Sequence, residues 1–321
     1  MKLSVIVPTR DKAEHLDRTL ASYCAQTHGD FEVVIADDGS RDDAGERVAA
    51  RWRERFAVEY LRQPHRGRAA CRNRAIAAAR GELLVFADDD RLAAPQFLAE
   101  HARLYDAARA TVVLGAQRRA GAATVEEVAG DFAAIAAASS PEPWWEEACA
   151  PLARAYGERL DGFHIPWILG ATGNLSAPRA LVVEVGGFDE AFHGWGLEDL
   201  DLCYRLHHAG ARTVIGAAAI NYHQAHPTAG DGVRWIEWLR NLERFVEKYD
   251  RLDAAAYAYA YTRETMVDVP ALNDTIAALE RDAAAAPATT RALREAYVAI
   301  VRARIFALDW SGAHRLPGIR W

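Results

Sequence analysis

The length, composition and charge of the chain describe a globular protein and exclude some classes of function. Its 321 residues are enough for one large α/β domain, alone or with a helical appendage, and 51% are hydrophobic, so a sizeable core can form. The net charge of -7 argues against general binding of nucleic acid, which requires a basic surface. An anionic substrate can still bind where positive charge is local or where a metal ion supplies it.

The cysteines and the N-terminal residues favour a soluble, cytoplasmic protein. Cys24, Cys71, Cys149 and Cys203 form no C-x-x-C pair, which argues against a zinc knuckle, and scattered thiols are typical of a reducing compartment. The first residues do not have the pattern of a signal peptide, and no stretch approaches the roughly 20 apolar residues of a membrane helix. We expect no integral membrane segment and leave peripheral membrane contact open.

The first third of the chain alternates between strand and helix patterns. Apolar runs predict buried strands at residues 3–7 and 83–87 and a further apolar strand at 31–36, and a short strand is predicted at 58–61. Helical spacing or Ala-rich composition predicts helices at 12–26, from the turn at 37–40 to about 55, and at 68–79. This alternation indicates right-handed βαβ units and a parallel sheet flanked by helices.

The middle of the chain is less regular. Residues 117–165 have acidic and Ala-rich helical pieces, which we interpret as an insertion or lid. Order returns with a helix that begins at Pro178 and another that continues to about His208. Two strand-like pieces then lead to His223.

After Asp231 the pattern is almost wholly helical. Apolar residues recur at helical spacing at Trp235, Trp238, Leu239, Leu242, Phe245 and Val246. We therefore predict a domain over residues 1–228, with a nucleotide-binding half at 1–116 and an acceptor and catalytic half at 117–228. A helical C-terminal extension at 229–321 would cap the core, bind the acceptor or form a dimer contact, so a homodimer stays open.

Polar residues follow three of the predicted strands. They are Pro8-Thr9-Arg10, Asp37-Asp38-Gly39 and Asp88-Asp89-Asp90. Ligands of parallel α/β sheets bind beyond the carboxyl ends of the strands, so we expect these segments to line one crevice. Three adjacent carboxylates repel one another, and a divalent cation would relieve that repulsion and hold a diphosphate. Such oxygen ligands suit Mg²⁺ or Mn²⁺, although a solvated acidic turn is the alternative.

The turn after the second strand also allows two interpretations. The carboxylate of Asp38 can accept a hydrogen bond from a base or a ribose, but Asp37-Asp38-Gly39-Ser40 is equally a good turn sequence. The first strand lacks G-x-G-x-x-G at its end, which argues against a dinucleotide-binding Rossmann fold. The chain has no G-x-x-x-x-G-K-[ST], which excludes a P-loop.

The run from Gly194 to Asp201 is the candidate catalytic segment. Glu198, Asp199 and Asp201 crowd the start of a predicted helix, where the helix dipole favours negative charge, so capping is an alternative to catalysis. Trp195 lies between two glycines, which allow the backbone to turn sharply and to expose an indole face to a sugar ring.

A histidine after the last strand-like piece is a candidate metal ligand. A neutral imidazole at His223 can complete a carboxylate metal site, and His226 is a weaker candidate. The alternative for both is a structural role.

These segments, in this order, resemble the inverting glycosyltransferases of family 2, which have the nucleotide-diphospho-sugar (GT-A) fold. The matching pieces are SVIVPTR, VVIADDGS, GRAACRNRAIAAARGELLVFADDD and GGFDEAFHGWGLEDLDLCYRLHHAG. The resemblance covers roughly residues 1–225. Its W-G-x-E-D segment looks like the catalytic part of galactosyltransferase and chondroitin-synthase-type enzymes.

The resemblance implies a set of nucleotide-binding residues. Asp38 would accept from uracil, Arg72 would lie near the base or diphosphate, and Asp88 would contact the ribose. The whole predicted set is Pro8, Thr9, Arg10, Asp38, Arg72, Asp88 and Asp89. Many members have an aromatic-Asn pair where this chain has Arg10, so contacts to the base edges are not carried over.

The resemblance also implies the metal, sugar and catalytic residues. Asp90 and His223 would hold Mn²⁺ or Mg²⁺. Asp199 would be the general base, with Glu198 beside it. We assign Trp195, Gly196 and Asn174 to contacts with the sugar and the acceptor.

The resulting hypothesis is a metal-dependent inverting glycosyltransferase. It would move a sugar from a UDP-sugar, or another nucleoside-diphosphate sugar, to a hydroxyl of the acceptor. The alternatives are a sugar-1-phosphate nucleotidyltransferase, which would want a Gly-rich basic loop after the first strand, and a non-catalytic scaffold that binds nucleotide sugars.

Overall fold

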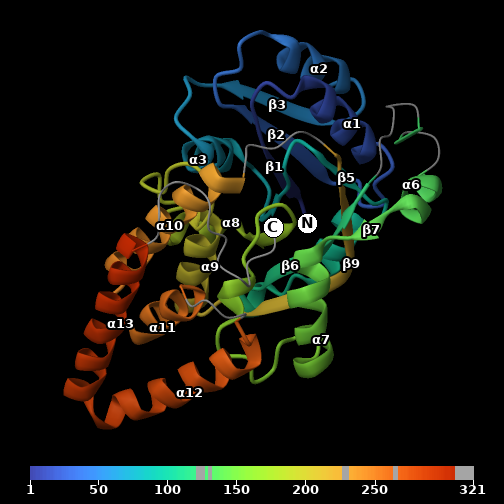
Figure 1. Ribbon diagram of the computed structural model, residues 1–321. Coiled ribbons are helices and arrows are strands. Elements are labelled where there is room, and N and C mark those ends of the chain that lie inside the picture. Colours follow the sequence, from blue (N-terminus) through green and yellow to red (C-terminus); the bar gives the residue numbers. More distant parts are fainter. Residues whose placement is uncertain (121–126, 129–131, 226–230, 263–266, 308–321) are drawn as a thin grey trace.

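The computed structural model describes residues 1–120, 127–128, 132–225, 231–262 and 267–307. Its centre is a nine-stranded sheet in the order β3-β2-β1-β4-β8-β6-β9-β5, with β7 paired to β6 (Figure 1). The strands are β1 (Leu3–Thr9), β2 (Phe31–Asp37), β3 (Ala57–Arg62), β4 (Leu83–Phe86), β5 (Arg91–Ala93), β6 (Val112–Arg119), β7 (Ser140–Pro141), β8 (Leu175–Pro178) and β9 (Thr213–His223). This architecture confirms the predicted α/β class.

The sheet is mainly parallel, as predicted. Strands β1, β2, β3, β4, β6 and β9 run in one direction, and β5, β7 and β8 run in the other. One expectation was wrong, because β9 is a single strand and not two pieces. Gly115 of β6 pairs with Gly216, but the next residue, Ala116, pairs with Ile220. The extra residues of β9 between these pairs form the irregularity that makes the sequence look like two strands.

Helices cover both faces of the sheet. The helices before the extension are α1 (Ala13–Tyr23), α2 (Ala44–Trp52), α3 (Arg68–Ala78), α4 (Phe97–Leu104), α6 (Phe132–Ala138), α7 (Ala150–Tyr156), α8 (Arg179–Glu184) and α9 (Glu198–His208). Alternate residues of a strand point to opposite faces. Accordingly, Val5 and Val7 pack in one core with Leu16 of α1, whereas Ile6 packs in the other with Ile76 of α3.

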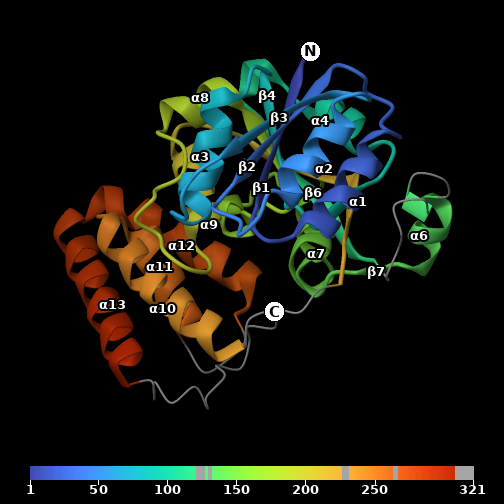
Figure 2. The same ribbon diagram turned by 90° about the horizontal axis from the view of Figure 1, so that it is seen from above.

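The helical extension comprises α10 (Asp231–Lys248), α11 (Leu252–Tyr261), α12 (Val269–Ala285) and α13 (Pro287–Ala307). Helices α10, α11 and α13 lie side by side (Figure 2), and Tyr204 of α9 contacts Phe245 of α10 and Asp253 of α11. All but the first of the predicted apolar positions of α10 are buried, at Trp238, Leu239, Leu242, Phe245 and Val246. The predicted boundary at residue 228 lies outside the described residues, so the division into two parts stays a prediction.

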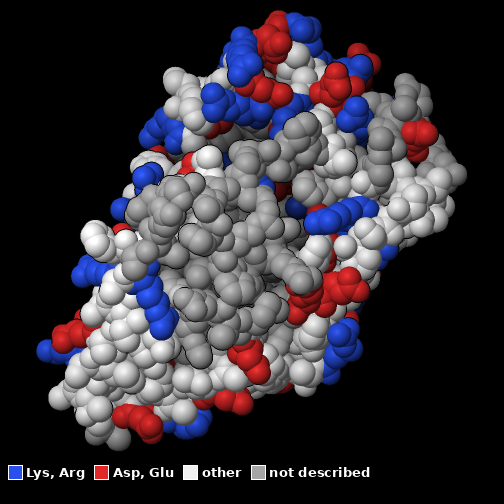
Figure 3. Space-filling model, viewed as in Figure 1, with Lys and Arg blue, Asp and Glu red and all other residues white. Residues whose placement is uncertain are grey.

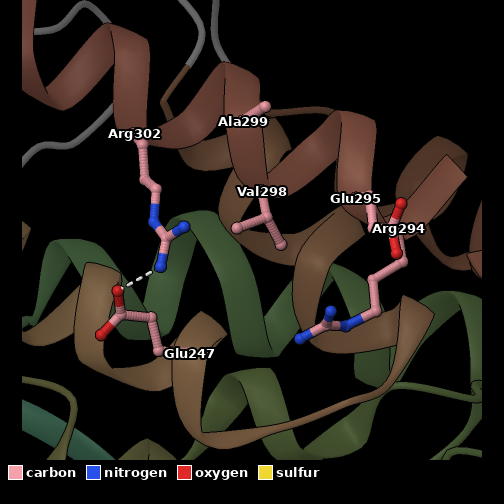
Figure 4. A pocket seen from close by; sticks show the side chains of 6 residues that line it. All are labelled: Glu247, Arg294, Glu295, Val298, Ala299 and Arg302. Atoms are coloured by element: carbon pink, nitrogen blue, oxygen red, sulfur yellow. Dashed lines mark hydrogen bonds and ion pairs between the residues drawn. The ribbon is translucent and has the colours of Figure 1, made fainter. Parts of the chain in front are cut away.

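A small hollow lies between α10 and α13. It is lined by Glu247, Arg294, Glu295, Val298, Ala299 and Arg302 (Figure 4). Glu247 of α10 and Arg302 of α13 form an ion pair across it. None of the residues predicted to bind nucleotide, metal or sugar lines this hollow.

Two further observations concern the distribution of surface charge and the length of the apolar helices. On the face seen in Figure 3, Lys and Arg are interspersed with Asp and Glu over the part that is coloured by charge. Within the described residues, no helix combines the length and the apolar character needed to cross a bilayer.

Candidate active site

The three polar segments that follow β1, β2 and β4 meet at one edge of the sheet, as expected. The hydroxyl of Thr9 donates to Asp89 Oδ2 at 2.7 Å, which joins the end of β1 to the acidic turn after β4. The backbone N–H of Asp38 donates to the carbonyl of Thr9 at 2.9 Å, which joins the ends of β2 and β1. Pro8 lies one residue inside this edge, paired with Ala36 of β2.

The carboxylate of Asp38 organises the loop that leads into α3. It accepts four hydrogen bonds, from Gln63 Nε2, His65 Nδ1 and the backbone N–H groups of Arg66 and Gly67, at 2.6–2.9 Å. Burial alone would raise the pKa of Asp38, but these donors hold that pKa below its ordinary value. Asp38 therefore has a structural role, and its predicted contact with uracil stays a prediction.

Arg10 is linked to Asp38 through His65. A carboxylate of lowered pKa only accepts hydrogen bonds, so Nδ1 of His65 carries the proton and Nε2 is an acceptor. Nε2 of His65 lies 2.9 Å from Arg10 Nη1, which donates to it. The chain Arg10–His65–Asp38 keeps the exposed guanidinium of Arg10 at the edge where the base is predicted to bind.

A buried arginine joins the acidic turn to the candidate catalytic helix. Arg72, on α3, is only 4% exposed. Its guanidinium lies 3.2 Å from Asp88 Oδ1 and 3.2 Å from Glu198 Oε1, at the first turn of α9. Two segments that are more than 100 residues apart in sequence are thus held together by one cation.

Asp199 lies next to this contact. Burial is the main cause that raises its pKa to about 7, the neighbouring Glu198 raises it further, and Arg72 opposes the rise. The carboxylate accepts a hydrogen bond from the N–H of Leu200 at 2.9 Å. A carboxylate whose pKa lies near neutrality can both take up and release a proton at physiological pH.

Asp89 and Asp90 share a positively charged neighbour, Lys12. Its ammonium lies 2.6 Å from Asp90 Oδ2 and 3.6 Å from Asp89 Oδ1. Burial, and next the charge of Asp90, raise the pKa of Asp89 to about 7, while Lys12 and the hydroxyl of Thr9 oppose the rise. Lys12 was not among the predicted site residues, because its contact with Asp90 joins residues 78 positions apart.

His223 faces Asp90, as predicted for a shared metal site. Its Nε2 lies 3.7 Å from Asp90 Oδ1, and its Nδ1 lies 2.9 Å from Glu142 Oε1. Burial alone would raise the pKa of Glu142, but His223, Arg91 and Arg119 lower it to about 2, so this carboxylate is ionised and Nδ1 is the donor. A carboxylate that fixes the second ring nitrogen is the usual support of a metal-binding histidine.

The donor set fits a divalent ion that is held partly by substrate. Nε2 of His223 and the carboxylate of Asp90 face each other, and Mg²⁺ commonly uses one or two protein groups together with phosphate oxygens. Within the described part of the chain, no three His, Cys, Asp or Glu side chains are grouped as a metal site made by protein alone. His226 lies outside the described residues.

The loop before α9 is shaped by α10. Gly194 and Gly196 have φ angles of 75° and 91°, which residues with a side chain rarely adopt. A Cβ atom on Gly196 would lie 2.8 Å from Trp238 Cδ1. Asn241 donates to the carbonyls of His193 at 3.0 Å and of Gly196 at 2.8 Å.

The indole of Trp195 lies in this loop. It is partly exposed, and Arg234 of α10 lies over its ring with its guanidinium carbon 5.7 Å from the ring centroid. Helix α10 thus contributes directly to the surroundings of the residue that we assigned to the sugar or acceptor.

Asn174 requires a correction. It is 1% exposed, and its Nδ2 donates to the carbonyls of Ala116 and Ala219 at 2.8 and 2.9 Å. Its Oδ1 is paired with His101 Nε2 at 3.0 Å. Because every polar group of this amide has a partner inside the sheet, Asn174 stabilises the β6–β9 irregularity and does not face a sugar.

Two other residues of the site were missed by the sequence analysis. Glu142 lies in the segment that we interpreted as an insertion or lid, and Asn241 lies in a helix for which the sequence analysis singled out only the apolar positions. Both act through contacts with residues far away in sequence, which motif spacing does not reveal.

Comparison with known proteins identifies the family. Residues 4–155 match the model described as glycosyl transferase family 2, and residues 162–227 match the N-terminal domain of galactosyltransferase. Validoxylamine A glucosyltransferase of Streptomyces hygroscopicus subsp. jinggangensis is 34% identical over 78% of this chain and 61% of its own length. The uncharacterized glycosyltransferase YfnE of Bacillus subtilis is 30% identical over 78% of this chain and 71% of its own. The chain belongs to glycosyltransferase family 2.

The solved structures agree on the fold. GalNAc-T7, solved with UDP, GalNAc and Mn²⁺, superposes with a TM-score of 0.60 and 15% identity, over 81% of this chain and 51% of that one. The expected GT-A fold is therefore confirmed. The matched part of this chain spans only about 60% of the validoxylamine A glucosyltransferase.

Proposed function

We propose that this chain transfers a sugar from a UDP-sugar, or another nucleoside-diphosphate sugar, to an acceptor hydroxyl with inversion at the anomeric carbon. The observation that carries the proposal is Arg72, whose buried guanidinium holds Asp88 of the acidic turn against Glu198 of the catalytic helix. Family membership supports sugar transfer, and the UDP in GalNAc-T7 supports that nucleotide.

Asp90 and His223 would hold a divalent ion, Mn²⁺ or Mg²⁺, with Glu142 orienting the imidazole. When bound, the metal would act as a Lewis acid that neutralises charge on the leaving diphosphate. The Mn²⁺ in GalNAc-T7 supports this assignment.

Asp199 would remove the proton from the acceptor hydroxyl. Its raised pKa keeps the carboxylate basic enough to take a proton near neutral pH. The carboxylate of Glu198 is already engaged in an ion pair with Arg72, which favours Asp199 over its neighbour as the base. Trp195 and Gly196 would border the sugar and the acceptor.

The replacement Asp199→Asn tests the base. General-base catalysis is typically worth 10² to 10⁴ in rate, so turnover should fall at least about 100-fold while UDP binding survives. Asp282→Asn, at an exposed carboxylate of α12, is the matched control and should leave turnover unchanged. Near-normal turnover in Asp199→Asn would remove this residue from the role.

Product analysis tests the reaction class. Incubation of the protein with a panel of UDP-, GDP- and dTDP-sugars and Mn²⁺ should release the nucleoside diphosphate slowly, even with water as acceptor. Release of pyrophosphate would indicate a nucleotidyltransferase, and no release would indicate a binding scaffold. Excess chelator should abolish turnover, and Mn²⁺ or Mg²⁺ should restore it. The acceptor, a cytoplasmic location and a homodimer stay predictions.

A further inference from the structure

The strongest feature that the proposed function leaves unused is Lys12. This residue lies in the turn between β1 and α1, and its side chain is 32% exposed. Its ammonium lies 2.6 Å from Asp90 Oδ2 and 3.6 Å from Asp89 Oδ1. A cation of the protein therefore pairs with the same carboxylate that we assign to the divalent ion.

Two cations cannot share Asp90 without repelling each other. A charged neighbour within about 4–6 Å changes the proton affinity of a carboxylate by about 10-fold to 1,000-fold, and a divalent ion is repelled more strongly than a proton. A metal ion that approaches Asp90 and His223 must therefore work against Lys12. The lysine stem is long and flexible, so the ammonium can move several ångströms without moving the backbone.

The acidic turn does not depend on Lys12 for its shape. The hydroxyl of Thr19 donates to the carbonyl of Asp89 at 2.8 Å, and the N–H of Gln224 donates to the carbonyl of Asp90 at 2.9 Å. Thr9 holds the Asp89 side chain. These contacts would remain if Lys12 lost its charge, so the ammonium acts on the charge of the turn and not on its conformation.

We propose that Lys12 is a built-in counter-ion that occupies Asp90 in the free protein, is displaced by the divalent metal, and then pairs with the diphosphate of the donor. This proposal rests on the proposed function. It makes the metal and the nucleotide bind with positive coupling, because the diphosphate supplies the negative charge that the displaced ammonium requires.

The first experiment measures Mn²⁺ binding to the full chain without nucleotide, by the loss of the free-ion signal in electron paramagnetic resonance. Lys12→Met should tighten Mn²⁺ binding at least about tenfold, because the competing cation is gone. Lys2→Met is the matched control, since Lys2 pairs with Glu32 near the opposite end of β1, and it should bind Mn²⁺ as the unmodified chain does. Unchanged or weaker binding in Lys12→Met would overturn the proposal.

The second experiment measures nucleotide binding at saturating Mn²⁺ by calorimetry. UDP should bind at least about fivefold more weakly to Lys12→Met, because a charge-assisted contact to phosphate is lost, whereas uridine should bind equally to both. Lys12→Arg should retain most of the UDP affinity. Equal UDP affinity in Lys12→Met and the unmodified chain would refute the second half of the proposal.

The two proposals fail in different ways. If the unmodified chain binds UDP with Mn²⁺ and Lys12→Met behaves identically in both experiments, the counter-ion is wrong and the proposed function stands. If the unmodified chain binds neither Mn²⁺ nor UDP, alone or together, both proposals are wrong.

Discussion

Replacing Arg72 by methionine tests whether one guanidinium holds the acidic turn after β4 and the first turn of α9 together. Methionine keeps an unbranched apolar stem of similar length but leaves Asp88 and Glu198 without their shared cation. Removing one partner of a buried ion pair typically costs about 3–5 kcal/mol. Because the Asp88 side chain is 33% exposed and so remains partly hydrated, we expect the lower value, about 3 kcal/mol at neutral pH.

The loss of stability in Arg72→Met should be larger at high pH than at low pH. The pKa of Asp199 is raised to about 7, mainly by burial, so the folded chain binds its proton more tightly than the unfolded chain, and this group's contribution to stability falls as pH rises toward 7. Arg72 opposes that rise in pKa. Without Arg72 the ionised carboxylates repel one another more strongly, so the loss of stability should be larger at pH 8 than at pH 5.5.

Urea unfolding of both proteins at the two pH values measures the effect. Arg74→Met is the matched control, because Arg74 lies on the same helix but is exposed. Its free energy of unfolding should change by less than about 0.5 kcal/mol. A loss below about 1 kcal/mol in Arg72→Met, or an equal loss at both pH values, would refute the assignment.

Three further predictions follow from the contacts of the helical extension. Gly196→Ala should destabilise more than Gly210→Ala in thermal unfolding, because both glycines have φ near 90° but only Gly196 would bring a Cβ to 2.8 Å from Trp238; equal losses would exclude this contact as the cause. Asn241→Ala should lower turnover at least about tenfold and leave UDP affinity unchanged, because the loop before α9 shifts; an equal loss of UDP affinity would contradict this. Burial alone would raise the pKa of Asp253, but His208 and Arg251 lower that pKa below its ordinary value. The ionised carboxylate therefore stabilises the fold at neutral pH, and this contribution to stability is lost as pH falls below about 4. Asp253→Asn should therefore be less stable than the unmodified chain at pH 7 and closer to it at pH 3, and a constant difference would contradict the assignment.

Much of the fold could be predicted from local patterns. Strands β1, β2 and β4 are apolar runs that are almost wholly buried, because helices cover both faces of the sheet, and such runs are easy to recognise. Strand β3, at the edge of the sheet, is only partly buried. Strands β5 and β8 have no comparable signal, and the apolar start of β6, Val112-Val113-Leu114, was overlooked. Strand β9 was expected as two pieces, and the structure shows one strand whose irregularity leaves Ala217 and Ala218 exposed.

The candidate site could be predicted only where a motif carried it. Asp90 and His223 were found because acidic and histidine residues follow strands, and the structure places them 3.7 Å apart. Lys12 and Asn241 were missed, because their roles arise from contacts that only folding creates. Asn174 was assigned wrongly, because a polar residue beside glycines gives the same sequence pattern whether it lies in a binding loop or in a buried hydrogen-bond network.

The contacts of Asn241 and Trp238 with residues 193–196 determine which sequence changes can alter this loop. The glycine-rich loop lies in the segment that matches galactosyltransferase, but the side chains that fix it, Asn241 and Trp238, lie beyond both matched segments. Sequence change in α10 can therefore reshape this loop while the edge of the sheet built from β1, β2 and the acidic turn keeps its form. Under the proposed function, exchanging α10 between relatives is therefore a way to alter the choice of acceptor without altering the donor site.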